Sequence, residues 1–321
     1  MSALIEIKNL KKYFNSNRGT VHAVDDVSFT INERSTMGLV GESGCGKSTL
    51  GRTLVHLHES TDGKIFFEDK DVTKLNKKQL TALHQNAQII FQDPFSSLNP
   101  RLTVKDTISE PALLSGKYKK EDLEDVTFQL MEKVGIEKRY QYSFPHELDG
   151  GRRQRVGIAR ALAVDPKFIV CDEPVSALDV SIQAQILNLL MDLQEKQDLT
   201  YLFVTHDMSV VRHISDYICV MYLGQLVETC PTKEFFKNPL HPYSKALLSA
   251  VPSINIHKKR ERIILKGEIT SPINPKPGCR FANRCLHAGE QCRGKKIDLD
   301  EVLPGHFVAC HNPDALTEIR V

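Results

Sequence analysis

The stretch Gly41-Glu42-Ser43-Gly44-Cys45-Gly46-Lys47-Ser48-Thr49 decides the fold class of this chain. It follows an apolar run, Met37 to Val40, and precedes a helix-compatible stretch from Thr49 to Leu57. In this order of strand, glycine-rich loop and helix, backbone N–H groups and the helix N-terminus hold phosphate groups. The flanking strand and helix favour this interpretation over an ordinary glycine loop. The sequence therefore predicts a phosphate-binding loop in an α/β fold.

Two side chains of this loop have specific predicted roles. Lys47 would neutralise the charge of a terminal phosphate, and the Ser48 hydroxyl would take one coordination position of Mg²⁺. The residues expected to surround the bound phosphates are Gly41, Ser43, Gly44, Cys45, Gly46, Lys47, Ser48 and Thr49.

A pair of carboxylates follows a second apolar run. Residues Phe168 to Cys171 predict a strand that is buried on both faces, as in a parallel sheet covered by helices. Asp172 at its end would hold Mg²⁺, usually through water, and Glu173 would polarise an attacking water molecule. A plain solvated turn is the alternative, and the phosphate loop in the same chain makes it the less favoured one.

Between these elements lies Leu148-Asp149-Gly150-Gly151-Arg152-Arg153-Gln154-Arg155, a glycine pair that opens a basic helix. Many nucleotide hydrolases have the two outer elements, but few have such a segment between them. The whole set resembles the nucleotide-binding subunits of ATP-binding cassette (ABC) transporters, over nearly the full chain. Further matches, in the family's order, are Gln92 after Ile89–Phe91, Ser176–Asp179, and His206 after Tyr201–Val204. Their order and spacing carry the resemblance.

The resemblance implies an ATP site with Mg²⁺. Gln92 would reach the metal or the attacking water with its amide, and His206 would form a hydrogen bond near the terminal phosphate. The adenine-stacking aromatic maps onto Phe14, with Tyr13 as the alternative. Base stacking on an aromatic ring is worth roughly 1–3 kcal/mol. Ordinary core packing is the other interpretation of either ring.

The resemblance also implies a dimer of two ATP-binding subunits, because the signature of one subunit completes the phosphate site of the other. The signature residues expected to face the partner's ATP are Leu148, Asp149, Gly150, Gly151 and Arg152. In the family, position 149 is usually serine and position 152 usually glutamine. A carboxylate about 4 Å from a phosphate charge costs on the order of 4 kcal/mol at an effective dielectric near 20. We therefore expect an asymmetric heterodimer in which Asp149 weakens one site.

A second interpretation of Asp149 is purely local. Aspartate is a good helix N-cap and would accept a hydrogen bond from the free N–H of Gly151 or Arg152 without touching nucleotide. Arg152 would then offset part of the added negative charge.

The order of strands and helices predicts two domains. Residues 1–250 would form the ATP-binding domain: an antiparallel β N-terminal part, a phosphate-loop sheet covered by helices, and a helical insert at about 93–150. Residues 251–321 would form a small cysteine-rich extension. Its approach, Asn238 to Leu248, resembles the segment that closes the cassette in oligopeptide and dipeptide importers.

Four of the eight cysteines cluster in this extension: Cys279, Cys285, Cys292 and Cys310, separated by five, six and seventeen residues. Clustered thiols in a cytosolic protein suggest a metal rather than disulfides. The resemblance to peptide importers favours a [4Fe–4S] cluster with a structural task. Zinc remains open, although the loops are longer than is typical of zinc fingers, and so do unligated or disulfide-prone thiols. The scattered Cys45, Cys171, Cys219 and Cys230 suit small buried apolar roles.

Composition limits the function classes. The 42 basic and 40 acidic residues nearly cancel, which gives no broad electrostatic reason to expect nucleic-acid binding. No apolar run approaches the roughly 18 to 20 residues needed to span a bilayer, and the first residues do not resemble a signal peptide. We expect a peripheral ATPase at the cytoplasmic face of the cell membrane.

The resemblance therefore predicts an ATPase that energises peptide import. Its expected partners are a second ATP-binding subunit, two transmembrane permease subunits and an extracytoplasmic solute-binding protein. Import of nickel or another small solute, and a soluble ABC ATPase outside transport, remain alternatives. A redox or metal sensor built on the cysteine tail is a further one.

Overall fold

The structure is a computed structural model that describes residues 2–251, 262–265, 267 and 270–312. The chain forms two compact units. One contains Lys74–Val204, and the other contains Ser2–Thr73 together with Thr205–Val321. These units do not coincide with the predicted division near residue 250, which adjoins the undescribed segment 252–261 and stays a prediction.

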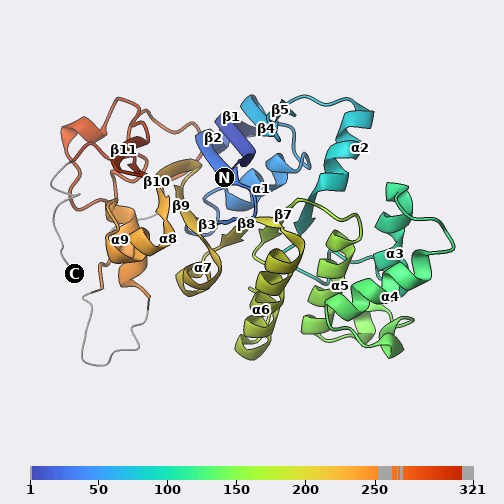
Figure 1. Cartoon of the computed structure of the whole chain (residues 1–321). Coiled ribbons are helices and arrows are strands. Elements are labelled where there is room, and N and C mark those ends of the chain that lie inside the picture. Colours follow the sequence, from blue (N-terminus) through green and yellow to red (C-terminus); the bar gives the residue numbers. More distant parts are fainter. Residues whose placement is uncertain (1, 252–261, 266, 268–269, 313–321) are drawn as a thin grey trace. The chain divides into compact units, whose positions relative to one another are not determined.

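An antiparallel sheet begins the second of these units. Its strands, in the order β2-β1-β4-β5, are β2 (Gly19–Asn32), β1 (Ala3–Ser16), β4 (Asp62–Phe67) and β5 (Lys70–Asp71). Strand β1 pairs on both sides, with Ile7 opposite Phe29 of β2 and opposite Ile65 of β4. These apolar side chains are buried and hold the sheet together. The predicted antiparallel N-terminal part is confirmed (Figure 1).

The same unit contains the strand that leads into the phosphate loop. Strand β3 (Thr36–Val40) is buried at every residue and runs parallel to β9 (Tyr217–Tyr222). Strands β10 (Gln225–Pro231), β12 (His306–Val308) and β11 (Asp300–Leu303) continue from β9 in antiparallel pairs. The accompanying helices are α1 (Lys47–Leu54), α7 (Met208–Ile214), α8 (Thr232–Lys237) and α9 (Pro242–Ser249). The cysteine-rich extension thus supplies two strands to this unit.

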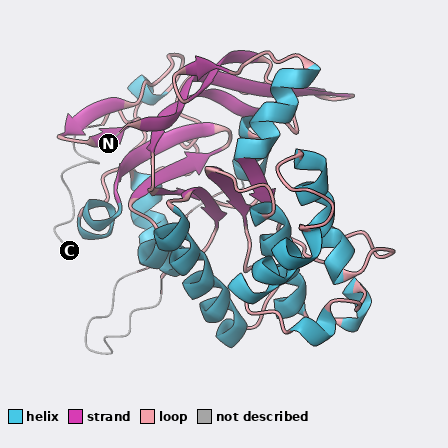
Figure 2. Ribbon diagram, turned by 45° about the vertical axis from the view of Figure 1, so that its right-hand side comes forward, coloured by secondary structure: helices cyan, strands magenta, loops and turns pink. Residues whose placement is uncertain are grey.

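The unit Lys74–Val204 has a parallel core and a helical insert. Strands β6 (Ala87–Ile90), β7 (Phe168–Asp172) and β8 (Thr200–Thr205) pair in parallel. Its helices are α2 (Lys77–Asn86), α3 (Val104–Ser115), α4 (Leu123–Lys133), α5 (Gly150–Leu162) and α6 (Val180–Gln197), with short 3₁₀ turns at Lys138–Tyr140 and Pro145–Glu147. Helices α3, α4 and α5 pack against one another (Figure 1, Figure 2). The predicted insert and the fully buried strand β7 are confirmed.

One boundary differs from its prediction. The helix after the phosphate loop spans Lys47–Leu54, so it begins two residues earlier and ends three residues earlier than the predicted Thr49–Leu57. It begins at once because the left-handed Gly46 turns the chain directly into the helix. It ends because His56 adopts φ 56°, a left-handed conformation that a right-handed helix does not contain. None of the helices in the described part of the chain is long and apolar enough to cross a membrane.

Candidate functional site

The phosphate loop is shaped by glycines in conformations that other residues avoid. Gly44 and Gly46 have φ values of 77° and 106°. A Cβ atom on Gly46 would lie 2.0 Å from the carbonyl oxygen of Ala23, whereas one on Gly44 would meet nothing within 4 Å. Gly46 therefore permits close backbone packing, and Gly44 lines open space beside the loop. This arrangement fits the backbone cradle that phosphates require.

Lys47 is held inside this loop by backbone carbonyl groups. Its Nζ donates hydrogen bonds to the carbonyl oxygens of Gly41 (2.8 Å) and Glu42 (3.0 Å). The side chain is buried, with only 4% of its surface exposed, so these acceptors offset the cost of burying the ammonium group. Burial raises the pKa of the neighbouring Cys45 thiol, which suits a small apolar side chain rather than a reactive thiolate. Ser48 and Thr49 follow in the first turn of α1.

The structure distinguishes the two aromatic candidates of β1. The Tyr13 ring stacks on His22 with centroids 4.0 Å apart, and its hydroxyl donates to Asp25. Burial, together with this hydrogen bond, raises the Tyr13 pKa above its ordinary value. Phe14 is 36% exposed and has the Nζ of Lys12 4.7 Å from its ring centroid. Phe14 is thus the accessible ring, and Tyr13 is engaged in a polar network.

The carboxylate pair at the end of β7 has two different environments. Asp172 is fully buried. Glu173 adopts φ 48°, a left-handed conformation that costs a non-glycine residue roughly 1–3 kcal/mol and that clusters at functional sites. The Nε2 of Gln92 donates to Glu173 Oε2 at 3.0 Å. The structure therefore brings together two of the three predicted catalytic side chains. The third, His206, is exposed directly after β8, in the other unit.

The signature segment opens α5 as a capped helix. Asp149 is the N-cap residue, and its Oδ1 accepts a hydrogen bond from the backbone N–H of Arg152 at 2.7 Å. The Arg152 guanidinium also forms an ion pair with the Asp149 carboxylate. The predicted N-cap role of Asp149 is confirmed, and Arg152 supplies the expected compensating charge. Whether Asp149 also faces a partner's ATP stays a prediction. Because both side chains are more than a third exposed, water screens this pair.

The two signature glycines lie against the segment that follows Glu173. Leu148 is buried. Cβ atoms on Gly150 and Gly151 would lie 3.2 Å from Leu178 and 2.8 Å from Ile182, respectively. Both glycines therefore permit a close approach of the start of α5 to the start of α6.

Comparison with known proteins decides the family. The ABC transporter family model matches residues 24–176, and the model for the C-terminal region of oligopeptide/dipeptide transporters matches residues 227–292. The oligopeptide transport ATP-binding protein AppF of Bacillus subtilis is 48% identical over 318 residues, covering 96% of this chain and 97% of the relative. The chain is an ABC transporter ATP-binding subunit. It therefore binds and hydrolyses ATP.

Further relatives and solved structures agree with this family. The dipeptide transport ATP-binding protein DppF of Escherichia coli is 44% identical over 317 residues, 97% of this chain and 95% of the relative. The ATP-binding cassette MJ0796, solved as a dimer bound to ADP and Pi, gives a TM-score of 0.65 at 28% identity, covering 71% of this chain and 98% of that one. The subunit cbiO1 of Clostridium perfringens gives 0.65 at 27% identity, covering 74% and 91%. The ABC subunit thus has the phosphate-loop ATPase fold.

The four clustered cysteines of the ABC subunit are buried or partly buried. Burial, together with the charges of Cys292, Cys285 and Cys310, raises the pKa of Cys279 to about 12. Burial likewise raises the pKa of Cys285 and Cys310, each also influenced by other members of the set. The backbone N–H of Cys279 donates to the carbonyl of Cys292 at 2.9 Å, which ties two of the ligand candidates together.

A buried polar group that sequence reasoning missed lies beside β10. Among the described residues, Glu228, Cys230 and His306 place their ligand atoms within 4.8 Å of one another, and the four clustered thiols are not part of this set. Glu228 accepts hydrogen bonds from the backbone N–H groups of Leu240 and His241 and lies 2.7 Å from His306 Nε2. These partners satisfy the carboxylate of Glu228. The group therefore joins His306 of the extension to β10. The spacing of the three residues in the sequence gave no signal for it.

Proposed function

We propose that this ABC subunit energises the import of oligopeptides or dipeptides across the cytoplasmic membrane through partner permeases. The observation that carries the proposal is similarity along almost the whole chain to relatives named for oligopeptide and dipeptide transport. The match of residues 227–292 to the C-terminal region of that transporter class supports it independently. The protein would act as a peripheral subunit at the cytoplasmic face.

The test is co-purification followed by transport. The tagged subunit, expressed together with candidate permease genes, is expected to retain permease chains and to hydrolyse ATP faster when peptides and the solute-binding protein are added. Nickel and amino acids serve as control solutes. Stimulation by nickel but not by peptides would favour the small-solute importer, and solute-independent activity without permeases would favour a soluble ABC ATPase.

For ATP hydrolysis we propose roles that follow the geometry of each unit. Lys47 and the loop backbone bind phosphates, and Phe14 stacks on adenine. Glu173 orients the attacking water, with Gln92 holding its carboxylate in place through the 3.0 Å hydrogen bond. His206 completes the hydrogen bonding to the terminal phosphate.

The proposed Mg²⁺ ligands have the chemistry that this ion prefers. Ser48 and Gln92 supply hydroxyl and amide oxygens, and Asp172 supplies a buried carboxylate that would act through water. Bound Mg²⁺ supplies neutralisation of phosphate charge. Glu173→Gln is expected to lower hydrolysis at least about a hundredfold while ATP binding is retained, as measured by turnover and by nucleotide titration.

We further propose a heterodimer of two ATP-binding subunits with unequal sites. Asp149 carries the argument, because the partner's ATP would face a carboxylate where the family has serine. The ion pair with Arg152 lowers the expected repulsion below that of an isolated carboxylate. Glu173→Gln and the equivalent change in the partner are expected to reduce transport-coupled ATPase activity unequally. Equal losses would argue against asymmetry.

For the extension we propose a structural [4Fe–4S] cluster held by Cys279, Cys285, Cys292 and Cys310. The donor set suits such a group, since four thiols bind thiolate-preferring metals and the other three cysteines influence the pKa of Cys279. A bound cluster supplies covalent links between loops of the extension. Because the raised pKa values of Cys279, Cys285 and Cys310 keep these three thiols protonated, ligand binding must displace protons and should weaken as the pH falls.

Anaerobic purification with visible absorbance, iron, sulfide and zinc analysis tests this proposal. Cys285→Ser is expected to lower the iron content strongly, whereas Cys219→Ala, at a scattered buried cysteine, should retain it. A colourless protein without iron would overturn the cluster proposal. Stoichiometric zinc would instead indicate a zinc site.

A further inference from the structure

An arginine of the extension, Arg284, pairs with a glutamate of the phosphate loop. Arg284 immediately precedes Cys285, and its Nη1 and Nη2 donate to the two carboxylate oxygens of Glu42 at 2.7 Å and 3.1 Å. The Arg284 side chain is only 9% exposed. Pairing with Glu42 raises the pKa of the guanidinium above its ordinary value. This two-pronged geometry is the strong form of an arginine–carboxylate contact, and lysine does not reproduce it.

Glu42 is the second residue of the phosphate loop, and its backbone is held as firmly as its side chain. Its N–H donates to the Tyr243 hydroxyl at 2.9 Å. Its carbonyl oxygen accepts from Lys47 Nζ at 3.0 Å and from the Cys45 N–H at 3.3 Å. The residue that Arg284 holds therefore also helps to place the ammonium group that neutralises phosphate charge.

The turn that carries Arg284 is packed into a buried aromatic cluster. Phe281 is buried and contacts Tyr222 and Tyr243, with ring centroids 5.2 Å and 5.3 Å apart. These rings belong to the same buried cluster as Val40, the last residue of β3 before the loop. Arg284 thus belongs to a packed turn. Its contact with Glu42 therefore depends on how the extension is folded.

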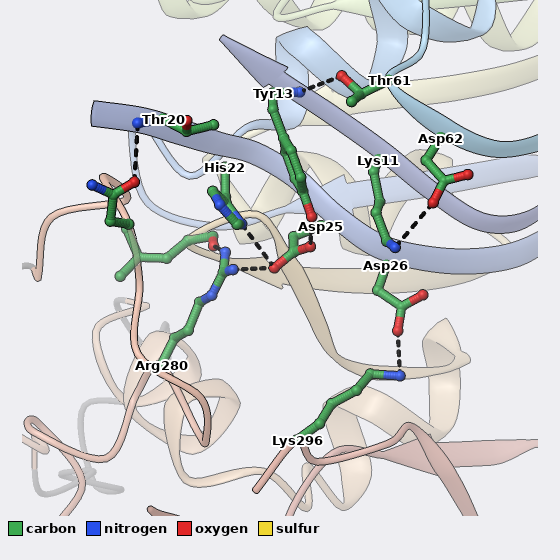
Figure 3. Close-up of polar contacts among 12 residues, drawn as sticks. Lys11, Tyr13, Thr20, His22, Asp25, Asp26, Thr61, Asp62, Arg280 and Lys296 are labelled. Carbon is green, nitrogen blue, oxygen red and sulfur yellow. Dashed lines mark hydrogen bonds and ion pairs between the residues drawn. The ribbon is translucent and has the colours of Figure 1, made fainter. Parts of the chain in front are cut away.

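A second arginine of the same turn contacts β2, the strand that pairs with the Phe14-bearing β1. Arg280 forms an ion pair with Asp25 of β2, the residue that also accepts from the Tyr13 hydroxyl (Figure 3). Lys296 of the extension pairs with the adjacent Asp26. The extension therefore contacts both the phosphate loop and the strand pair next to the adenine-stacking residue.

Electrostatics gives Arg284 a role beyond packing. A carboxylate in a loop that receives a polyphosphate repels the ligand, and the repulsion grows with the number of phosphate charges. A buried guanidinium paired with Glu42 removes most of this repulsion. We propose that Arg284 is a positioning residue of the nucleotide site, which acts through Glu42 to hold the phosphate loop ready for ATP. This role depends on ATP binding alone and is independent of which solute is transported.

The test compares nucleotide affinities of the full-length chain by titration calorimetry with ATP, ADP and AMP. Arg284→Met is expected to weaken ATP binding about tenfold, ADP less and AMP least, because the unpaired Glu42 charge acts on phosphates. Arg284→Lys should recover the affinity in part. Adding Glu42→Gln to Arg284→Met should restore ATP binding toward that of Glu42→Gln alone.

Arg280→Met is the matched control, since it removes an arginine of the same turn that contacts Asp25 instead of the loop. It is expected to lose no preference for ATP over AMP. Equal losses for all three nucleotides with Arg284→Met, or no recovery in the double variant, would overturn the proposal. If Arg284→Met does not fold, Arg284→Lys and the double variant decide the same question. Failure of peptide-stimulated ATPase activity would leave these affinities unaffected.

Discussion

The phosphate loop and the signature segment both combine glycines with an acidic residue paired to an arginine, but for different physical reasons. In the phosphate loop, Gly46 has a left-handed backbone, and Glu42 pairs with an arginine 242 residues away in the sequence. In the signature, Gly151 is an ordinary helical residue, and Asp149 pairs with Arg152 three residues later. The acidic residue of the first segment is thus paired across its unit, whereas that of the second is paired within one helix turn.

The largest effect is expected for Gly46→Ala. The new Cβ would meet the Ala23 carbonyl oxygen at 2.0 Å in a conformation that alanine rarely adopts. Backbone cannot yield as a side chain does, so the free energy of unfolding should fall by on the order of 3 kcal/mol or more, and ATP binding should be lost. Denaturant unfolding and nucleotide titration measure the two quantities. Near-normal ATP affinity would contradict the described loop.

Mild acid is expected to destabilise helix α9, whose Tyr243 hydroxyl accepts a hydrogen bond from the N–H of Glu42 in the phosphate loop. His241 caps α9 by accepting a hydrogen bond from the Tyr243 N–H at Nδ1, and burial lowers its pKa to about 4. A lowered histidine pKa means that stability is complete above the unfolded value of about 6.5 and declines as the pH falls toward 4. The total loss is on the order of 3 kcal/mol.

Hydrogen exchange of the α9 amides at several pH values would measure this decline. His241→Asn keeps a capping acceptor and removes the titration, so its profile should be flat over the same range. An equally steep profile in this variant would assign the decline to another group. Exchange at the start of α5 serves as the internal control, because the signature is capped by a different residue, Asp149.

A smaller effect is expected for Gly151→Ala. Its Cβ would lie 2.8 Å from the Cγ2 atom of Ile182, a side chain that is able to shift. We expect a loss of about 1–2 kcal/mol in the free energy of unfolding. The double variant with Ile182→Ala should lose less than the sum of the two single changes. Additive losses would show that the contact with Ile182 does not cause the loss of stability.

The smallest stability effect is expected for Asp149→Ser. Serine also caps a helix, and the exposed pair with Arg152 contributes at most about 1 kcal/mol. Unfolding should therefore change by about 0.5 kcal/mol or less, while ATP hydrolysis by the assembled transporter should increase if the carboxylate weakens the partner's site. Unchanged hydrolysis would assign Asp149 to capping alone. Asp149→Ala, which removes cap and charge together, separates the two contributions.

Much of the fold followed from local patterns. Apolar runs predicted β3 and β7, and glycine with lysine and serine predicted the phosphate loop, because these depend on residues close in sequence. The scattered Cys45, Cys171, Cys219 and Cys230 were expected to be buried, and they are. Helix ends were less accurate, since the end of α1 depends on the left-handed His56.

In the candidate site too, contacts between neighbours in the sequence were predicted better than contacts between distant residues. The N-cap role of Asp149 involves neighbours in one helix turn and could be read from the sequence. The family resemblance favoured Phe14 over Tyr13, but the contacts of Tyr13 with His22 and Asp25 of the adjacent strand could not be read from the sequence. Arg284 was visible beside Cys285, but nothing in its spacing indicated Glu42 as its partner.

The sequence by itself determined which chemistry this ABC subunit carries: a phosphate loop, a carboxylate pair and a signature with aspartate in place of serine. Those features are written in short segments whose local geometry depends on their own residues. Only the tertiary structure decided what supports the phosphate loop, since the contacts of Glu42 with Tyr243 and Arg284 join residues 201 and 242 positions apart. Such contacts form because folding buries Phe281, Tyr222 and Tyr243 in one cluster, and that burial brings the charged groups together.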